Sequence, residues 1–227
     1  MFDQSRFVDV LTQYKQDFDP IVWKENKEYY KWKAIQCFQN NWKVNASAFP
    51  EMLMSAFDDA YNLLDTRYRF PKKMIIEFAK EAPEVVRSMF ISLFDESQDV
   101  VERIESFKHK AQMLLRKYGN GAKQHYQDEN TITTYLWLRF PDRYYIYRFN
   151  AVHAATKELH ADYSFKKGHY AENIRNCLQF YDELNQSIKA DRELVGLFQS
   201  HLTDDLYPDP ELKTLTVDFA YYIYAYY

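Results

Sequence analysis

Apolar positions along the chain recur mainly at the three- and four-residue spacing of an amphipathic helix. The clearest stripes run through residues 4–18, 23–42, 99–118 and 170–189, with charged side chains on the opposite faces. Proline or capping residues predict further helices at 48–64, from Pro71, from Pro83, at 191–202 and at 210–227. Asn150 is the expected cap of a helix over 151–160. The pattern predicts an all-α fold.

Residues 125–150 are the one stretch where the period is ambiguous. Ile132, Leu136 and Phe140 fit a helix, but the alternation from Ile132 to Phe140 also fits a strand. We favour a helix, capped by Asp128 or Asn130, because Pro141 and Asp142 lack the Asn-Gly chemistry of a two-residue hairpin. A short extended or β element is expected after it, near 143–148.

Composition supports a helical domain and shows no internal boundary. Only four of the 227 residues are glycine, which disfavours a sheet with tight hairpins. No repeat, low-complexity tract or domain-scale linker interrupts the helical patterns. We therefore expect one compact domain over 1–227. Its aromatic C-terminal run, DFAYYIYAYY, has no cap or polar tail, which suggests a domain cut from a longer protein.

Charge and cysteine content narrow the possible settings and partners. The two cysteines lie far apart in helical runs, and the N-terminus lacks the basic and apolar regions of a signal peptide. No uncharged run reaches the ~18 residues of a membrane span. These features predict a cytoplasmic protein without a membrane partner. A net charge of -4 means that any DNA contact would be local.

Three basic clusters are candidate DNA-binding sites. Arginine can hold phosphates, and aromatic rings can stack on bases. The alternative is that the aromatics form the core and the arginines pair with nearby carboxylates. The candidates are Arg139, Arg143, Tyr145 and Arg148; Arg67, Arg69, Lys72 and Lys73 at a predicted helix start; and Lys166 and Lys167 in a predicted turn.

Motifs of catalysis are sparse. No GxxxxGK[ST] loop occurs, so the chain carries no nucleotide-hydrolysing motif, and no cofactor is expected. Asp142 with Lys157 and Glu158, or Asp209 with Glu211 and Lys213, only partly matches the carboxylate and lysine set of metal-dependent nucleases. The six histidines form no metal-binding or Ser-His-Asp pattern. No catalytic or metal-binding residue is therefore expected.

Four runs carry a family resemblance that covers most of the chain: YQDENTITTYLWLRFPDRYYIYRF, PKKMIIEFAKEAPEVVRSMFISLFDES, FKKGHYAENIRN and LTDDLYPDPELKTLTVDFAYYI. With these runs the chain resembles the N-terminal region of McrB-like proteins, which are AAA+ GTPases of modification-dependent restriction systems. The resemblance implies a non-catalytic domain that recognises DNA, often at a modified base. It further implies an AAA+ motor in the same polypeptide and a separate nuclease partner that cuts the DNA in anti-phage defence.

A protein-interaction or adaptor module of the same defence complex is the alternative, because tyrosine suits binding surfaces as well as interiors. A metal-dependent nuclease is the third possibility. Neither the DNA motif nor the modification follows from the sequence.

Overall fold

The structure is a computed structural model that describes residues 1–227, and it consists of twelve α-helices with no strand. The predicted all-α fold class is confirmed. None of the helices combines the length and the apolar composition needed to span a bilayer.

The helices gather into two compact units, where the sequence predicts one domain. The first unit comprises residues 1–32 and 141–227, and the second comprises residues 33–140. One boundary falls inside a helix, between Trp32 and Lys33, and the other precedes Pro141. An uninterrupted helical pattern crosses the first boundary, so composition could not show it.

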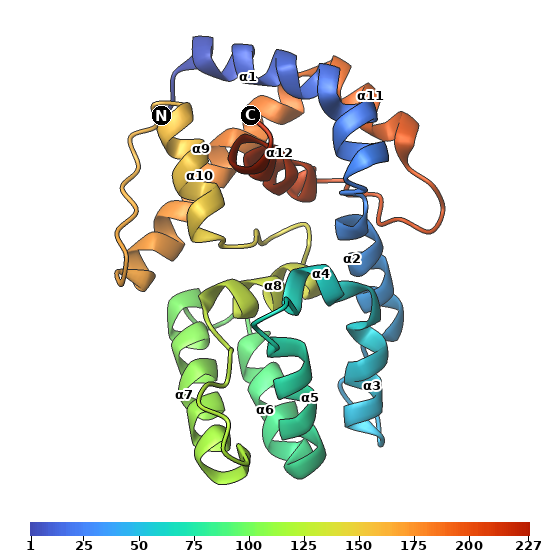
Figure 1. Ribbon diagram of the computed structural model, residues 1–227, viewed down its shortest axis with the longest axis vertical. Coiled ribbons are helices and arrows are strands. Elements are labelled where there is room, and N and C mark those ends of the chain that lie inside the picture. The colour runs from blue at the N-terminus through green and yellow to red at the C-terminus, as the bar shows by residue number, and fades with distance from the viewer. The chain divides into compact units, whose positions relative to one another are not determined.

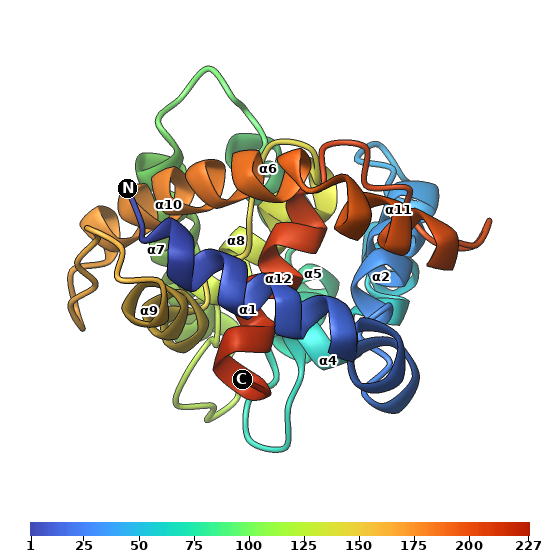
Figure 2. The same cartoon turned by 90° about the horizontal axis from the view of Figure 1, so that it is seen from above.

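The first unit is built from the two ends of the chain (Figure 1). It contains α1 (Gln4–Asp17), the π-helix η1 (Phe18–Glu25), the start of α2 (Tyr30–Asn41), α9 (Phe149–Glu158), α10 (Tyr170–Ala190), α11 (Arg192–His201) and α12 (Lys213–Ala225). Helix α12 packs against α1, α9 and α10, and Figure 2 shows it passing beneath α1. Tyr14 of α1 meets Phe219 of α12 edge to face, with ring centroids 5.2 Å apart. Aromatic packing therefore holds the N-terminal helix on the C-terminal one.

The second unit has its own aromatic core. It contains the rest of α2, α3 (Phe49–Ala56), the 3₁₀ turn η2 (Asp58–Ala60), α4 (Tyr61–Leu64), α5 (Pro71–Glu81), α6 (Pro83–Leu93), α7 (Val100–Tyr118) and α8 (Glu129–Arg139). Helices α5, α6 and α7 lie side by side (Figure 1). The buried ring of Tyr135 in α8 lies 5.2 Å from Phe57 and from Phe90, and 5.8 Å from Phe107. One side chain of α8 thus joins three other segments of this unit.

The ambiguous segment after residue 128 is a helix. Asp128 is its N-cap, and its side chain accepts a hydrogen bond from the backbone N–H of Thr131 at 3.0 Å. Residues 144–148 continue without regular structure, so the expected extended piece forms no β ladder. The spacing of apolar residues alone could not exclude a strand. Nine residues of α8 are buried, so this helix has no polar face that would mark a helical period.

Several predicted boundaries are wrong. The helix expected over 23–42 begins only at Tyr30, because residues 18–25 form η1. The stretch 48–64 splits into α3, η2 and α4. Helix α9 begins at Phe149, one residue before the expected cap Asn150, and its N-cap is Arg148. A continuous apolar stripe does not reveal such breaks, since each piece keeps an inward-facing side.

The last helix also begins later than predicted. Asp209 was expected to open it, but α12 starts at Lys213 after a left-handed Leu212. Asp209 still caps this helix from a distance, because its buried carboxylate accepts hydrogen bonds from the N–H groups of Thr214 (3.2 Å) and Leu215 (2.9 Å). The sequence therefore identified Asp209 as the capping residue, but it did not show that three residues separate Asp209 from the first residue of α12.

Candidate nucleic-acid interface

The segment 143–148 has an exposed arginine at each end and mostly buried residues between them. Arg143 and Arg148 are exposed, whereas Tyr145 and Tyr147 are buried. The Tyr145 hydroxyl donates to Asp182 at 2.8 Å, and its ring lies 5.0 Å from that of Tyr181. Burial raises the pKa of Tyr145 above its ordinary value, and the Asp182 carboxylate adds to this shift. Tyr145, expected to contact DNA, instead packs in the interior with its ring closed to a nucleobase.

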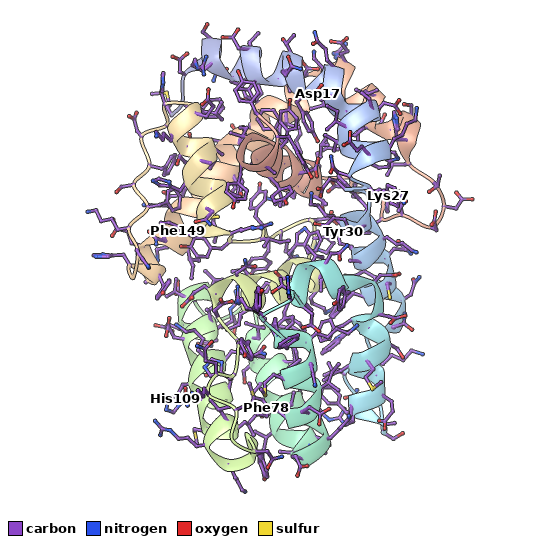
Figure 3. The ribbon with its side chains drawn as sticks, viewed as in Figure 1. Asp17, Lys27, Tyr30, Phe78, His109 and Phe149 are labelled. Carbon is purple, nitrogen blue, oxygen red and sulfur yellow. The ribbon has the colours of Figure 1, made fainter.

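Arg148 lies against the surface of α12. Its guanidinium carbon is 4.8 Å from the ring centroid of Tyr221 and 5.6 Å from that of Tyr224. No carboxylate lies within ion-pair distance of it, and Tyr224 is 41% exposed. Arg148 also precedes α9, where a cation opposes the helix dipole; Figure 3 labels Phe149 at the start of that helix. We call Arg148, Tyr221 and Tyr224 the Arg–Tyr surface.

A buried charge network lies behind the Arg–Tyr surface. Lys31 donates to Glu28 at 2.6 Å and also to Asp218 of α12. The hydroxyl of Tyr14 donates to Asp218 at 2.5 Å, and that of Tyr226 donates to Glu28 at 2.6 Å. We call these five residues the Lys31 network. Lys31 also lies 4.7 Å from the centroid of Tyr221, so the network supports one ring of the surface from within.

Burial and charge act in opposite directions on this network. Burial lowers the pKa of Lys31, but the Asp218 and Glu28 carboxylates outweigh burial, and the pKa lies above its ordinary value. Burial raises the pKa of Asp218 even though Lys31 pulls it down. The helical stripe of residues 23–42 places Glu28 and Lys31 on the charged face, so the sequence does not show that they are buried. Their spacing of three residues was the only available signal.

The cluster at 67–73 lies in the second unit, at the start of α5. Free amides there were expected to form a phosphate site. The carboxylate of Asp65 takes that place, accepting a hydrogen bond from the backbone N–H of Lys72 at 3.0 Å. The ammonium of Lys72 is 3.4 Å from the carbonyl oxygen of Asp58, and Lys73 is exposed. An internal acid thus already occupies the N-terminus of this helix.

The two arginines of this cluster have different neighbours. Arg69 forms an ion pair with Asp128, the N-cap of α8, as the alternative interpretation of these cations expects. Arg67 has no carboxylate partner; its guanidinium carbon lies 5.3 Å from the ring of Tyr68, which is 73% exposed. Only Arg67 therefore combines an exposed cation with an exposed ring here.

The turn at Lys166 and Lys167 is exposed and lies in the first unit. Asn173 of α10 holds it, accepting from the N–H of Lys166 at 3.0 Å and donating to its carbonyl oxygen at 2.8 Å. The same amide donates to the Tyr147 hydroxyl at 3.1 Å. One side chain therefore joins the basic turn to the segment that carries Arg143 and Arg148.

Arg139 ends α8 in the second unit, where its guanidinium carbon lies 4.9 Å from the ring of Phe140. The predicted contacts are thus divided between the units. Arg143, Arg148, Lys166 and Lys167 belong to the first unit, whereas Arg67, Arg69, Lys72, Lys73 and Arg139 belong to the second.

In the second set considered for a nuclease, Asp209, Glu211 and Lys213 each engage a different partner. Asp209 caps α12, Glu211 pairs with Lys189, and Lys213 donates to Asp182 at 2.8 Å. No three His, Cys, Asp or Glu side chains lie together as the ligands of a metal ion would.

Comparison of the chain with family models, with curated proteins and with solved structures gave no match. The fold and the side-chain geometry therefore carry the functional argument.

Proposed function

We propose that the chain is a non-catalytic DNA-recognition domain of an McrB-like restriction motor and that the Arg–Tyr surface contacts the DNA. The supporting observation is the position of Arg148, an exposed cation without a carboxylate partner beside two tyrosine rings. Arginine neutralises a phosphate and tyrosine stacks on a base, so this combination suits a nucleotide strand.

The location of the surface also fits the charge of the whole chain. With a net charge of -4, long-range attraction to DNA is weak, and binding depends on a few well-placed cations. Arg143, Lys166 and Lys167 are exposed on the same unit and add positive charge to it. The expected affinity is modest and falls steeply with added salt.

Fluorescence anisotropy with labelled oligonucleotides tests this proposal. Single-stranded and duplex DNA, each with cytosine or methylcytosine, are titrated with the wild-type chain, Arg148→Glu and Tyr224→Ala. Arg148→Glu should weaken binding at least about tenfold, since it replaces a phosphate contact with a repulsion. Tyr224→Ala should weaken it by the roughly 1–3 kcal/mol of one stacked base.

Arg192→Glu is the matched control, because Arg192 is exposed in the first unit but lies on α11, away from the Arg–Tyr surface. It should leave the affinity nearly unchanged. Equal weakening by Arg192→Glu and Arg148→Glu would show that only net charge matters, and no binding to any of the four DNAs would refute the proposal.

A protein-interaction module is the second candidate, because arginine and tyrosine are also the side chains that dominate protein interfaces. The exposure of Tyr224 and Tyr227, 41% and 48%, favours it. Size-exclusion chromatography with the purified AAA+ motor distinguishes the two functions. A complex that forms without DNA and is lost in Tyr224→Ala, together with no DNA affinity, would support the adaptor function.

A further inference from the structure

A polar hollow of about 280 Å³ opens on the second unit beside the loop that connects α7 to α8. Its lining residues belong to the second unit, whereas the residues of the Arg–Tyr surface belong to the first. The lining residues are Arg69, Gln112, Lys123, Gln124, His125, Tyr126, Gln127 and Asp128. Its volume is just below the roughly 300–1,000 Å³ of small-molecule sites.

The wall of the hollow is held in place by Gln127, which is fully buried. Its amide nitrogen donates to the carbonyl oxygens of Pro71 at 2.9 Å and His125 at 3.0 Å. Its amide oxygen accepts a hydrogen bond from the buried Tyr135 hydroxyl at 2.8 Å. All of these bonds lie within one unit, so the shape of the hollow is preformed.

The residue before Gln127 has a strained backbone. Tyr126 adopts a φ of +58°, in the left-handed region that a bulky side chain rarely occupies. Its ring faces Phe70 edge to face at 6.3 Å, and Phe70 is 40% exposed. Tyr126 itself lines the hollow and brings an aromatic ring to it.

Several polar groups that line the hollow have no partner in the protein. Gln112, Lys123 and Gln124 make no hydrogen bond or ion pair. The Nδ1 atom of His125 accepts from the Gln127 N–H at 2.9 Å, which leaves Nε2–H free to donate. Burial lowers the pKa of His125, and Lys108 adds to this shift, so the ring stays neutral. The hollow thus offers two amides, an imidazole donor and an ammonium group.

The charge of the lining favours an anion. Arg69 and Lys123 supply two positive charges against the single carboxylate of Asp128. Asp128 pairs with Arg69 and caps the start of α8, so the net positive charge of the lining is that of Lys123. Lys123 is exposed and has no counterion.

A second hollow of the same unit, about 290 Å³, has a different balance. Lys72, Lys73 and Lys80 line it together with the three carboxylates Asp58, Asp65 and Glu77. Glu77 pairs with Lys80 at 2.8 Å, and Asp65 accepts from the backbone of Lys72. This hollow satisfies its own charges, whereas the one at Lys123 does not.

We propose that the hollow at Lys123 binds a nucleoside monophosphate, with the phosphate at Lys123 and Arg69, the base against Tyr126, and the free amides on the base edge. An aromatic face, amides that both donate and accept, and an excess of positive charge together match a planar heterocycle that carries a phosphate. A bare phosphate would use only the cations, and a nucleoside only the ring and amides. This site is independent of DNA binding by the Arg–Tyr surface.

Isothermal titration calorimetry of the full chain tests the site. The probes are the monophosphates of adenosine, guanosine, cytidine and uridine, the four nucleosides, and inorganic phosphate. At least one monophosphate should bind at least tenfold more tightly than its nucleoside and than phosphate. Competition with a short single strand distinguishes a free nucleotide from one within a strand, and either source supports the site.

Two variants locate the binding. Lys123→Ala removes a side chain without a partner, and Tyr126→Gly removes the ring while relieving the left-handed backbone, so both should fold. Each should weaken the monophosphate at least tenfold. Lys117→Ala, in the last turn of α7 and outside the hollow, should have no effect.

Three results would overturn the proposal: no monophosphate binding at millimolar concentration, phosphate binding as tightly as every monophosphate, or equal binding by the wild-type chain, Lys123→Ala and Tyr126→Gly. Because Arg148→Glu changes only the first unit, monophosphate binding that survives in that variant separates this site from the proposed DNA contact.

Discussion

Two buried ionisable side chains of the first unit, Lys31 and Asp209, are stabilised in opposite ways. Lys31 has two carboxylates beside it, and their negative charges compensate its positive charge. Asp209 has no cation; the N–H groups of Trp32, Thr214 and Leu215 donate to it instead. Dipoles compensate a buried charge less completely than an opposite charge does. Lys31 and Asp209 should therefore respond differently to mutation and to pH.

Lys31→Met should destabilise the fold by about 3–5 kcal/mol, because Glu28 and Asp218 would remain buried without their cation. Lys33→Ala is the comparison: that side chain is 47% exposed and 3.8 Å from Asp59, so its removal should cost no more than about 1 kcal/mol. Urea unfolding of both variants measures the difference. Similar losses in the two would contradict the account of the Lys31 network.

Asp209 predicts a pH dependence with a definite sign. Burial raises its pKa from 3.8 to about 6, so the folded chain holds the proton more tightly than the unfolded chain does. The stabilisation is complete below the unfolded pKa, declines as the pH rises through the folded pKa, and is lost above it. At about 1.4 kcal/mol per pKa unit, it amounts to about 3 kcal/mol.

Asp209→Asn, which does not titrate, isolates this contribution. The unfolding free energy of the wild-type chain relative to the variant should rise by roughly 2.4 kcal/mol between pH 7 and pH 4 and approach the full value below the unfolded pKa. Urea unfolding at a series of pH values gives this difference, and all other titrating groups cancel in it. A difference that does not change with pH would exclude a raised pKa at Asp209.

At the scale of the elements, the chain between α1 and α2 shows what a sequence pattern can and cannot reveal. Apolar spacing correctly predicted a helical segment, since η1 and α2 both place aromatic residues inward. It did not predict the turn at Lys27, which has a φ of +54° and which Figure 3 labels near the start of α2. A left-handed lysine has no local sequence signature, because tertiary contacts impose its conformation.

The candidate DNA-binding site also has some features that the sequence reveals and others that it does not. The two arginines that flank the run of tyrosines in residues 143–148 were visible in the sequence, and both face solvent. The pairing of Arg148 with Tyr221 joins positions far apart in the chain, and the capping of α5 by Asp65 depends on how a loop folds back. Long-range contacts of this kind are not encoded in any local period.

Lys27→Gly should stabilise the protein by about 1 kcal/mol, because glycine adopts a positive φ without strain and the Lys27 side chain is exposed. Lys24→Gly, the same exchange inside η1, should instead destabilise it by roughly 0.5–1 kcal/mol. Thermal unfolding of the two variants provides the test, and destabilisation in both would contradict the assignment of strain to Lys27.

At the scale of the whole molecule, the helices gather into two compact units, whereas the sequence predicts a single domain. The second unit is one continuous stretch with its own buried aromatic cluster around Tyr135. The first unit needs both ends of the chain. The two units should therefore differ in whether they can fold alone.

Residues 30–140, which include all of α2, should fold as a helical protein with a cooperative thermal transition, because the second unit has its own buried aromatic cluster. Circular dichroism during heating measures this. A broad, non-cooperative loss of helix would show that the second unit depends on the first.

The salt dependence of DNA binding tests whether Arg148 contacts a phosphate. For the wild-type chain, the logarithm of the association constant should fall linearly with the logarithm of salt concentration. In Arg148→Ala the magnitude of this slope should be smaller by about 0.7–0.9, the share of one phosphate contact. The same slope and affinity in both proteins, or no binding at about 50 mM salt, would contradict DNA recognition through Arg148.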